Sequence, residues 1–130
     1  MNRIVILFPL GDYPSNADGT QRVYEMDESL MEVLGQAKSM LLHSYVHDKS
    51  ANNAGAKVRL YHSALDGQPD EVGKEYGEGY DVSASGAVIQ TIEGPFCGRV
   101  LATLGVLDTS QPSATQKVFR MEIGATLILD

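Results

Sequence analysis

The sequence has few of the residues that build covalent cross-links, and it has no long apolar run. Cys97 is the single cysteine among 130 residues, which excludes an internal disulfide and a thiolate-rich zinc site within this chain. No stretch approaches the roughly 20 apolar residues that a membrane helix needs. We therefore expect no membrane span and a fold that packing alone stabilises.

Basic residues are also scarce. Ten Lys and Arg stand against seventeen Asp and Glu, for a net charge of −7, and no segment gathers the basic ones into a patch. Because phosphate binding needs such a patch, nucleic acid is not an expected partner. The apolar run at residues 4–8 ends at Pro9 and is too short for a signal peptide. We expect a protein that stays in the cytoplasm or is packaged into a virion.

The composition is that of an ordinary globular protein, with 43% hydrophobic and 21% charged residues. Its length suits a single domain over residues 1–130. Short apolar runs, several of them alternating with period two, are separated by turn-forming residues. They lie at residues 4–8, 38–47, 57–65, 80–92, 99–106 and 116–129. This spacing predicts an all-β fold, an antiparallel β-sandwich or a jelly-roll-like barrel.

Residues 27–46 allow two interpretations. Ser29 and Glu32 match a capping box and begin a stripe of apolar residues at helical spacing. Gly35 interrupts that stripe, and residues 38–47 also alternate as a strand would. We favour strands, with residues 38–47 and 57–65 forming a hairpin. The alternative is an α+β fold with one helix at about 27–46 packed on an antiparallel sheet.

Two short motifs carry a resemblance to a known group of proteins. Residues 60–67 run from a strand into an Asp-Gly turn, and residues 94–100 lead into a strand that is followed by a Pro-Ser-x-Thr loop at 112–115. Over residues 37–130 this pattern resembles the β-sandwich modules of phage particles and of some surface proteins. The resemblance implies a structural or adhesive role, and it implies no particular binding residue.

We find no pattern that predicts catalysis. His43, His47 and His62 could approach one another, but no His-Glu-x-x-His or similar metal motif contains them. Ser85 lacks the first glycine of a nucleophile elbow, and Cys97 has no base beside it in the sequence. Phosphate-binding loops are absent. We therefore expect a protein that is not an enzyme, with no catalytic residue, no metal and no cofactor.

The apolar chain ends favour assembly. Strand edges that stay open invite pairing between chains, so a protein with apolar strands at both ends must bury them or use them. We predict a structural subunit that self-assembles as a homo-oligomer or decorates a phage- or capsid-like particle. The predicted interface residues are Ile4, Val5, Ile6, Leu7, Phe8, Leu127, Ile128 and Leu129.

The alternative function is a carbohydrate- or ligand-binding β-sandwich module. Tyrosine suits sugar binding because it combines a flat apolar ring with a polar tip. Tyr76 and Tyr80 lie beside acidic, glycine-rich segments and are the predicted ligand contacts, whereas Tyr45 and Tyr61 are expected to pack on the sandwich.

Overall fold

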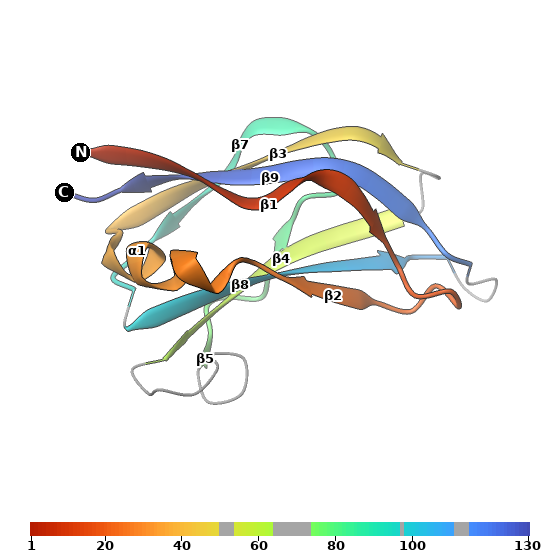
Figure 1. The fold of residues 1–130 in the computed structure, drawn as a ribbon, viewed down its shortest axis with the longest axis horizontal. Helices are drawn as coiled ribbons and strands as arrows, with labels where there is room; N and C mark the ends of the chain where they lie inside the picture. The colour runs from red at the N-terminus through yellow and green to blue at the C-terminus, as the bar shows by residue number, and fades with distance from the viewer. Residues whose placement is uncertain (50–53, 64–73, 97, 111–114) are drawn as a thin grey trace.

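The computed structural model describes residues 1–49, 54–63, 74–96, 98–110 and 115–130, which form two antiparallel sheets stacked face to face (Figure 1). Sheet A contains, in order, β1 (Asn2–Pro14), β9 (Val118–Ile128), β3 (Ser39–Lys49) and β7 (Gly86–Glu93). Sheet B contains β2 (Arg22–Glu25), β8 (Arg99–Asp108), β4 (Ala54–Ser63) and β5 (Lys74–Glu75), and β6 (Tyr80–Asp81) also pairs with β4. The predicted all-β sandwich is confirmed.

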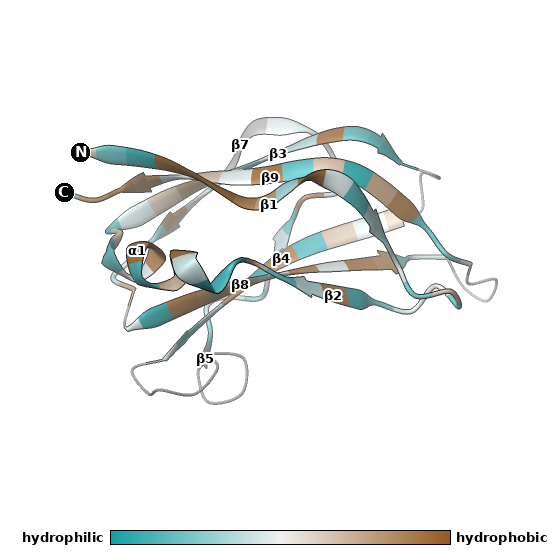
Figure 2. Cartoon of the chain, in the orientation of Figure 1, coloured by the Kyte–Doolittle hydropathy of each residue, from teal (hydrophilic) through white to brown (hydrophobic). Residues whose placement is uncertain are grey.

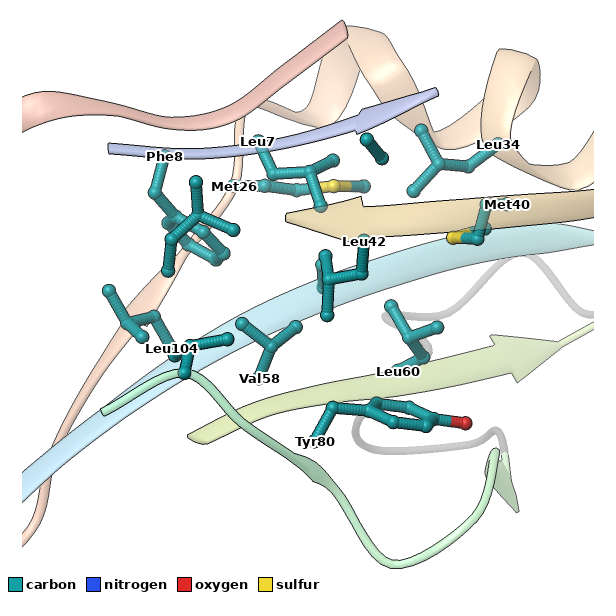
Figure 3. Packing of buried hydrophobic residues seen from close by; sticks show 14 of the residues in the cluster. Leu7, Phe8, Met26, Leu34, Met40, Leu42, Val58, Leu60, Tyr80 and Leu104 are labelled. Atoms are coloured by element: carbon teal, nitrogen blue, oxygen red, sulfur yellow. The ribbon is translucent and has the colours of Figure 1, made fainter. Parts of the chain in front are cut away.

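The core lies between the two sheets. Along β9, buried residues such as Met121 and Ile123 alternate with partly exposed ones, as the alternating colours along the strands indicate (Figure 2). Leu60 of β4 and Leu104 of β8 point into the same space from sheet B (Figure 3). Period-two alternation in the sequence therefore corresponds directly to the inner and outer faces of the sandwich.

Strand β1 changes its inward face part of the way along. Its register against β9 shifts between Ile6 and Phe8, so Leu7 and Phe8 are both buried although they are consecutive. Before this bulge, Val5 points inward and Ile4 and Ile6 point outward. A bulge that adds one residue to a strand reverses its alternation in this way. The apolar run at residues 4–8 therefore places side chains on both faces of the sheet, some in the core and some at the surface.

The contested segment contains a short helix followed by a long strand. A 3₁₀ turn, η1 (Glu28–Leu30), precedes α1 (Met31–Gln36). The carboxylate of Asp27 caps η1 by accepting a hydrogen bond from the Ser29 amide at 2.9 Å, whereas α1 begins after Leu30 without a side-chain cap. Ser29 is therefore not the helix cap that the capping box predicts. At residue 37 the backbone becomes extended, and the Lys38 amide donates to the Ile128 carbonyl at 2.7 Å. The strand prediction for 38–47 is correct, and the alternative of one helix over 27–46 is wrong.

The expected hairpin between residues 38–47 and 57–65 is also wrong. Strand β3 pairs with β9 and β7 in sheet A, whereas β4 pairs with β8 in sheet B. Serines instead tie the two sheets together where the chain passes from β6 to β7. Ser83 Oγ accepts from the Ala56 amide of β4 at 3.0 Å, and Ser85 Oγ accepts from the Val46 amide of β3 at 2.7 Å.

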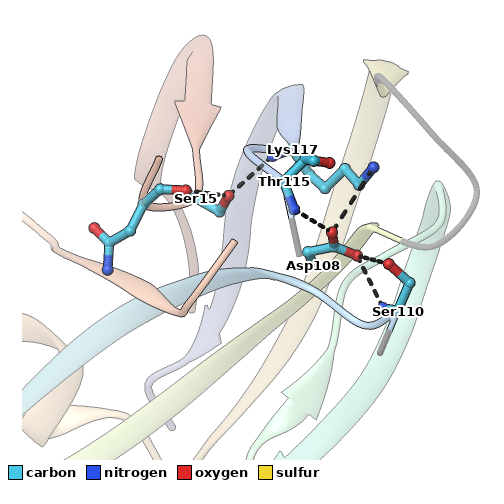
Figure 4. A network of polar contacts seen from close by, with 6 residues as sticks. Ser15, Asp108, Ser110, Thr115 and Lys117 are labelled. Carbon is cyan, nitrogen blue, oxygen red and sulfur yellow. Dashed lines mark hydrogen bonds and ion pairs between the residues drawn. The ribbon is translucent and has the colours of Figure 1, made fainter. Parts of the chain in front are cut away.

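A buried carboxylate organises one end of the sandwich (Figure 4). Asp108 accepts hydrogen bonds from the amide and the hydroxyl of Ser110, at 2.8 and 2.7 Å, and from the Thr115 amide at 2.8 Å. Lys117 Nζ lies 3.8 Å from its second oxygen. The hydrogen bonds from Ser110 and Thr115, with the nearby Lys117 charge, lower the pKa of Asp108 to about 2. This carboxylate joins the end of β8 to the segment that enters β9.

Candidate functional site

One side of β1 is an open sheet edge. The Leu129 amide donates to the Met1 carbonyl at 3.0 Å, and residues 2–6 then pair with β9 without interruption. In an antiparallel pair every second residue bonds across, so the amides of Arg3 and Val5 face β9. The N–H and C=O groups of Ile4 and Ile6 therefore face away from the sheet. Residues 2–6 form what we call the open edge.

The rest of β1 is poorly suited to pairing. Two register shifts, between Ile6 and Phe8 and between Phe8 and Gly11, bend the strand. Pro9 has no amide hydrogen to donate, and its carbonyl accepts a hydrogen bond from the Tyr13 hydroxyl. Bulges and prolines are the devices by which proteins protect edge strands. The open edge is thus limited to the first half of β1.

An apolar face adjoins the open edge. Ile4 is 71% exposed and Ile6 is 45% exposed, and both lie on the outer face of sheet A with the exposed Tyr45 of β3. A hollow of about 190 Å³ lies between these side chains, over Gly124 of β9. His43 lines this hollow, and its buried Nε2 has no hydrogen-bond partner among the described residues. The surface thus combines protruding isoleucines with a neighbouring depression.

The predicted interface residues divide between the core and this surface. The side chains of Val5, Leu7, Phe8 and Leu127 lie in the protein's own core. Ile128 and Leu129 are half-buried, and β9 is paired on both sides, by β1 and β3. Of the eight predicted residues, Ile4 and Ile6 are the large hydrophobic residues left exposed. The sequence gave no sign of this division, because inward and outward positions of residues 4–8 are all apolar.

A second depression crosses the outer face of sheet B. It has a volume of about 600 Å³ and spans β2, β8 and β4. Its lining residues are Gln21, Val23, Glu25, Arg59, Tyr61, Thr103 and Gly105. We call it the sheet B groove. Sequence reasoning missed it, because its residues come from three strands that are far apart in the chain.

The tyrosines are arranged differently from the prediction. Tyr80, expected to be an exposed ligand contact, is 8% exposed, and burial raises its pKa above the ordinary value. Tyr76 packs against the core, with its ring centroid 5.1 Å from that of Phe96. Tyr45, expected to pack, is exposed, and Tyr61 lines the sheet B groove. The predicted exposure of Tyr80 is therefore wrong, whereas Tyr76 is partly buried against the core.

The structure separates the three histidines. His43 and His47 belong to β3 of sheet A, whereas His62 belongs to β4 of sheet B and lies beside Tyr76. Within the described residues no group of three or more metal-ligating side chains occurs.

Cys97, the Asp-Gly turn at 66–67 and the Pro-Ser pair at 112–113 lie outside the part of the chain that the structure describes. No described helix is both long and apolar enough to cross a bilayer.

Comparison with known proteins gives similarities of fold. No protein-family model matches the chain, and no curated protein matches it. Similar solved structures include the VP2 subviral particle of infectious bursal disease virus, at 9% identity and a TM-score of 0.44, covering 98% of this chain and 33% of that one. T=1 particles derived from the same virus match at 9% identity and a TM-score of 0.48, covering 98% of this chain and 32% of that one.

A further match is the CBM36-1 domain of a multidomain xylanase from the hindgut metagenome of Trinervitermes trinervoides. The identity is 9% and the TM-score 0.40, and the match covers 96% of each chain. The present chain spans about a third of the length of the viral chains. These neighbours are proteins to which the chain is similar in fold. They concern the fold, and no functional residue is taken from them.

Proposed function

We propose that this protein is a non-catalytic structural subunit of a larger, capsid- or virion-like particle, and that it self-assembles through the open edge of β1. The observation that carries the proposal is the coincidence of two features on residues 2–6. Their outward backbone groups lack a strand partner among the described residues, and their outward side chains Ile4 and Ile6 are exposed and apolar. Unpaired edges of this kind are templates for pairing with another chain.

A second copy of the same edge is the simplest partner. Antiparallel pairing of two copies about a two-fold axis at Ile4 sets Ile4 opposite Ile4 and Asn2 opposite Ile6. The outward N–H and C=O groups then bond across the axis, and sheet A continues from one copy into the next. Isoleucines from both copies meet on one face, where cross-strand apolar pairs stabilise a sheet. The proposed contact is therefore self-complementary in both hydrogen bonding and packing.

The other sheet edges are less suited to this role. In sheet B, β2 has four residues and β5 has two, and short edge strands resist pairing. In sheet A the opposite edge is β7, whose described side chains include the exposed and polar Thr91 and Glu93. The edges of sheet B therefore offer little backbone, and the described outer residues Thr91 and Glu93 of β7 are polar, which favours β1.

The test compares oligomeric state between matched variants. Ile4→Lys places a charge at the proposed two-fold axis, and Val23→Lys places one at a 51% exposed site on β2 of the other sheet. Ile4→Pro removes one outward N–H and leaves the bonds to β9 in place. We expect light scattering after size exclusion, across micromolar concentrations, to show assembly of the wild type and of Val23→Lys. Ile4→Lys and Ile4→Pro are expected to be monomers with an unchanged circular dichroism spectrum.

Two results would contradict the proposal. One is a wild type that stays monomeric at every concentration. The other is an Ile4→Lys variant that assembles as the wild type does. Deleting the first strand is a poorer test, because it also removes Val5, Leu7 and Phe8 from the core.

A further inference from the structure

The hollow on the outer face of sheet A contains a histidine nitrogen that has no partner. We call this hollow, of about 190 Å³, the sheet A hollow; its lining includes Ile4, Ile6, His43, Tyr45, Glu122 and Gly124. The Nε2 atom of His43 is buried and makes no hydrogen bond within the described part of the chain. A buried polar atom without a partner is destabilising, and a ligand that hydrogen-bonds to it removes that cost.

The hollow exists because residue 124 is a glycine. The strand register sets Ile6 of β1 and His43 of β3 on either side of Gly124 of β9. A Cβ at Gly124 would lie 3.6 Å from Ile6 Cδ1 and 4.0 Å from His43 Nε2, so the ends of both side chains lie above the glycine. Ile6 therefore helps to shield Nε2 from solvent. Because Ile6 is 45% exposed, a change of its rotamer can uncover the nitrogen.

Glu122 gives the hollow a negative charge. It lies two residues before Gly124 on the same face of β9, and it is half-buried. Its carboxylate forms no ion pair with another residue that the structure describes. Arg120, the basic residue of β9, lies 3.4 Å from the Asp12 carboxylate instead. In a chain with a net charge of −7, this uncompensated carboxylate favours a cationic ligand.

The polar atoms of the hollow require a hydrogen-bond donor. An ionised carboxylate such as that of Glu122 only accepts hydrogen bonds. Nε2 of His43 also accepts when the imidazole is neutral and carries its proton on Nδ1. A primary ammonium group has three N–H donors, so it can bond to both residues and keep one donor for water.

The walls of the hollow suit an alkyl chain. Ile4 and Ile6 are exposed on the side of β1, and the exposed ring of Tyr45 lies on the side of β3, opposite Glu122. The Tyr45 ring packs against the His47 ring, with centroids 4.2 Å apart, and its face attracts a cation. A cavity of about 150 Å³ already holds a benzene-sized molecule. The sheet A hollow thus has room for a short aliphatic chain.

We infer that the sheet A hollow binds a small aliphatic amine in its ammonium form. Glu122 and His43 Nε2 accept hydrogen bonds from the ammonium group, and the alkyl chain packs between the isoleucines and Tyr45. The protruding side chains of Ile4 and Tyr45 keep a polypeptide backbone away from the floor, which favours a free amine. The inference does not depend on assembly, because one copy contains all of these residues and the proposed contact uses the edge of the sheet.

Titration with n-butylammonium, followed by NMR, tests the inference. The protein is kept below the concentration at which light scattering detects assembly. The solution is held at about pH 8, where alkylamines are protonated and histidine is ordinarily neutral. We expect saturable shifts of the Ile6 methyl signal and of the Glu122 and Gly124 amide signals. The controls n-butanol and butyrate have the same chain without the positive charge, and they should bind at least about tenfold more weakly.

Two substitutions test the acceptors. Glu122→Gln should weaken n-butylammonium binding about tenfold, the effect of one charged hydrogen bond at a half-buried site. Glu93→Gln is the matched control, because Glu93 is an exposed carboxylate of β7 that does not line the hollow. His43→Phe should weaken binding by a similar factor without lowering Tm, since it replaces a nitrogen that has no partner.

Light scattering separates this inference from the proposed function. Glu122→Gln should assemble as the wild type does, and a monomeric wild type that binds n-butylammonium would contradict assembly alone. The inference is overturned by the absence of saturable shifts, by full binding to a folded Glu122→Gln or His43→Phe variant, or by equal binding of n-butanol. Tighter binding of N-acetyl-lysine amide would also overturn it, because the hollow would then recognise a lysine side chain of another protein.

Discussion

Truncation of two consecutive side chains in β1 tests how the first strand divides between the core and the surface. Leu7 is 2% exposed and Ile6 is 45% exposed. Replacing a buried leucine by alanine costs about 2–5 kcal/mol of unfolding free energy, since it removes apolar contacts and leaves a cavity. Ile6→Ala removes a side chain that is about half covered, which costs about 1 kcal/mol. We therefore expect Leu7→Ala to be the more destabilising by about 1–4 kcal/mol.

The assays are urea unfolding and thermal unfolding, each followed by far-ultraviolet circular dichroism. Both substitutions are made in the Ile4→Lys background, because assembly would otherwise add to the apparent stability. For a chain of this length each kcal/mol lowers Tm by roughly 4 °C, so Leu7→Ala should lower it by roughly 8–20 °C. Equal losses for the two variants, or a larger loss for Ile6→Ala, would refute the alternation that directs Leu7 into the core and Ile6 to the surface.

Two further predictions concern single residues. Asp108→Asn should lower stability at neutral pH, because an amide has one acceptor oxygen and cannot serve both the Ser110 and the Thr115 amides. The folded-state pKa of about 2 lies below the ordinary 3.8, so stability from this carboxylate is complete above pH 3.8 and is lost as the pH falls toward 2. The difference in unfolding free energy between wild type and Asp108→Asn should therefore shrink as the pH falls from 3.8 toward 2. A difference that stays constant over this range would contradict the role of the ionised carboxylate. Gly35→Ala should cost about 1–3 kcal/mol, since its Cβ would lie 2.0 Å from the Gly98 carbonyl oxygen. Gly11→Ala is the matched control, because a Cβ at Gly11 would lie 3.9 Å from its nearest atom, the Pro9 carbonyl oxygen. Equal decreases in Tm for the two variants would refute the close contact at Gly35.

The strands were predictable where alternation alone defines them. Residues 99–106 and 116–129 were expected to be strands, and β8 and β9 cover most of both. Period-two patterning reports which face of a strand is buried, and this is why the sandwich could be expected from the sequence. The pattern says nothing about which strand lies beside which. The hairpin of residues 38–47 with 57–65 was predicted from proximity in the chain, yet both sides of β3 are occupied by β7 and β9.

The candidate sites were less predictable, for two physical reasons. Inward and outward positions of β1 are both apolar over residues 4–8, so the run contains core residues and exposed ones, and the bulge after Ile6 adds Phe8 to the core. The sheet B groove is lined by Gln21, Arg59 and Thr103, which are far apart in the chain. No local sequence motif predicts that they lie close together. Tyr80 was expected to be exposed because its neighbours are polar, but it points into the core (Figure 3).

Amide hydrogen exchange along β1, resolved by NMR, tests the assembly through the open edge most directly. Within one copy the amides of Arg3 and Val5 bond to β9, whereas those of Ile4 and Ile6 face the open side. At low protein concentration we predict slow exchange at Arg3 and Val5 and fast exchange at Ile4 and Ile6. At high concentration Ile4 and Ile6 should also become protected, because a second copy then accepts their hydrogen bonds. Exchange at Ile4 and Ile6 that stays fast while the protein assembles would contradict the claim that β1 is the contact.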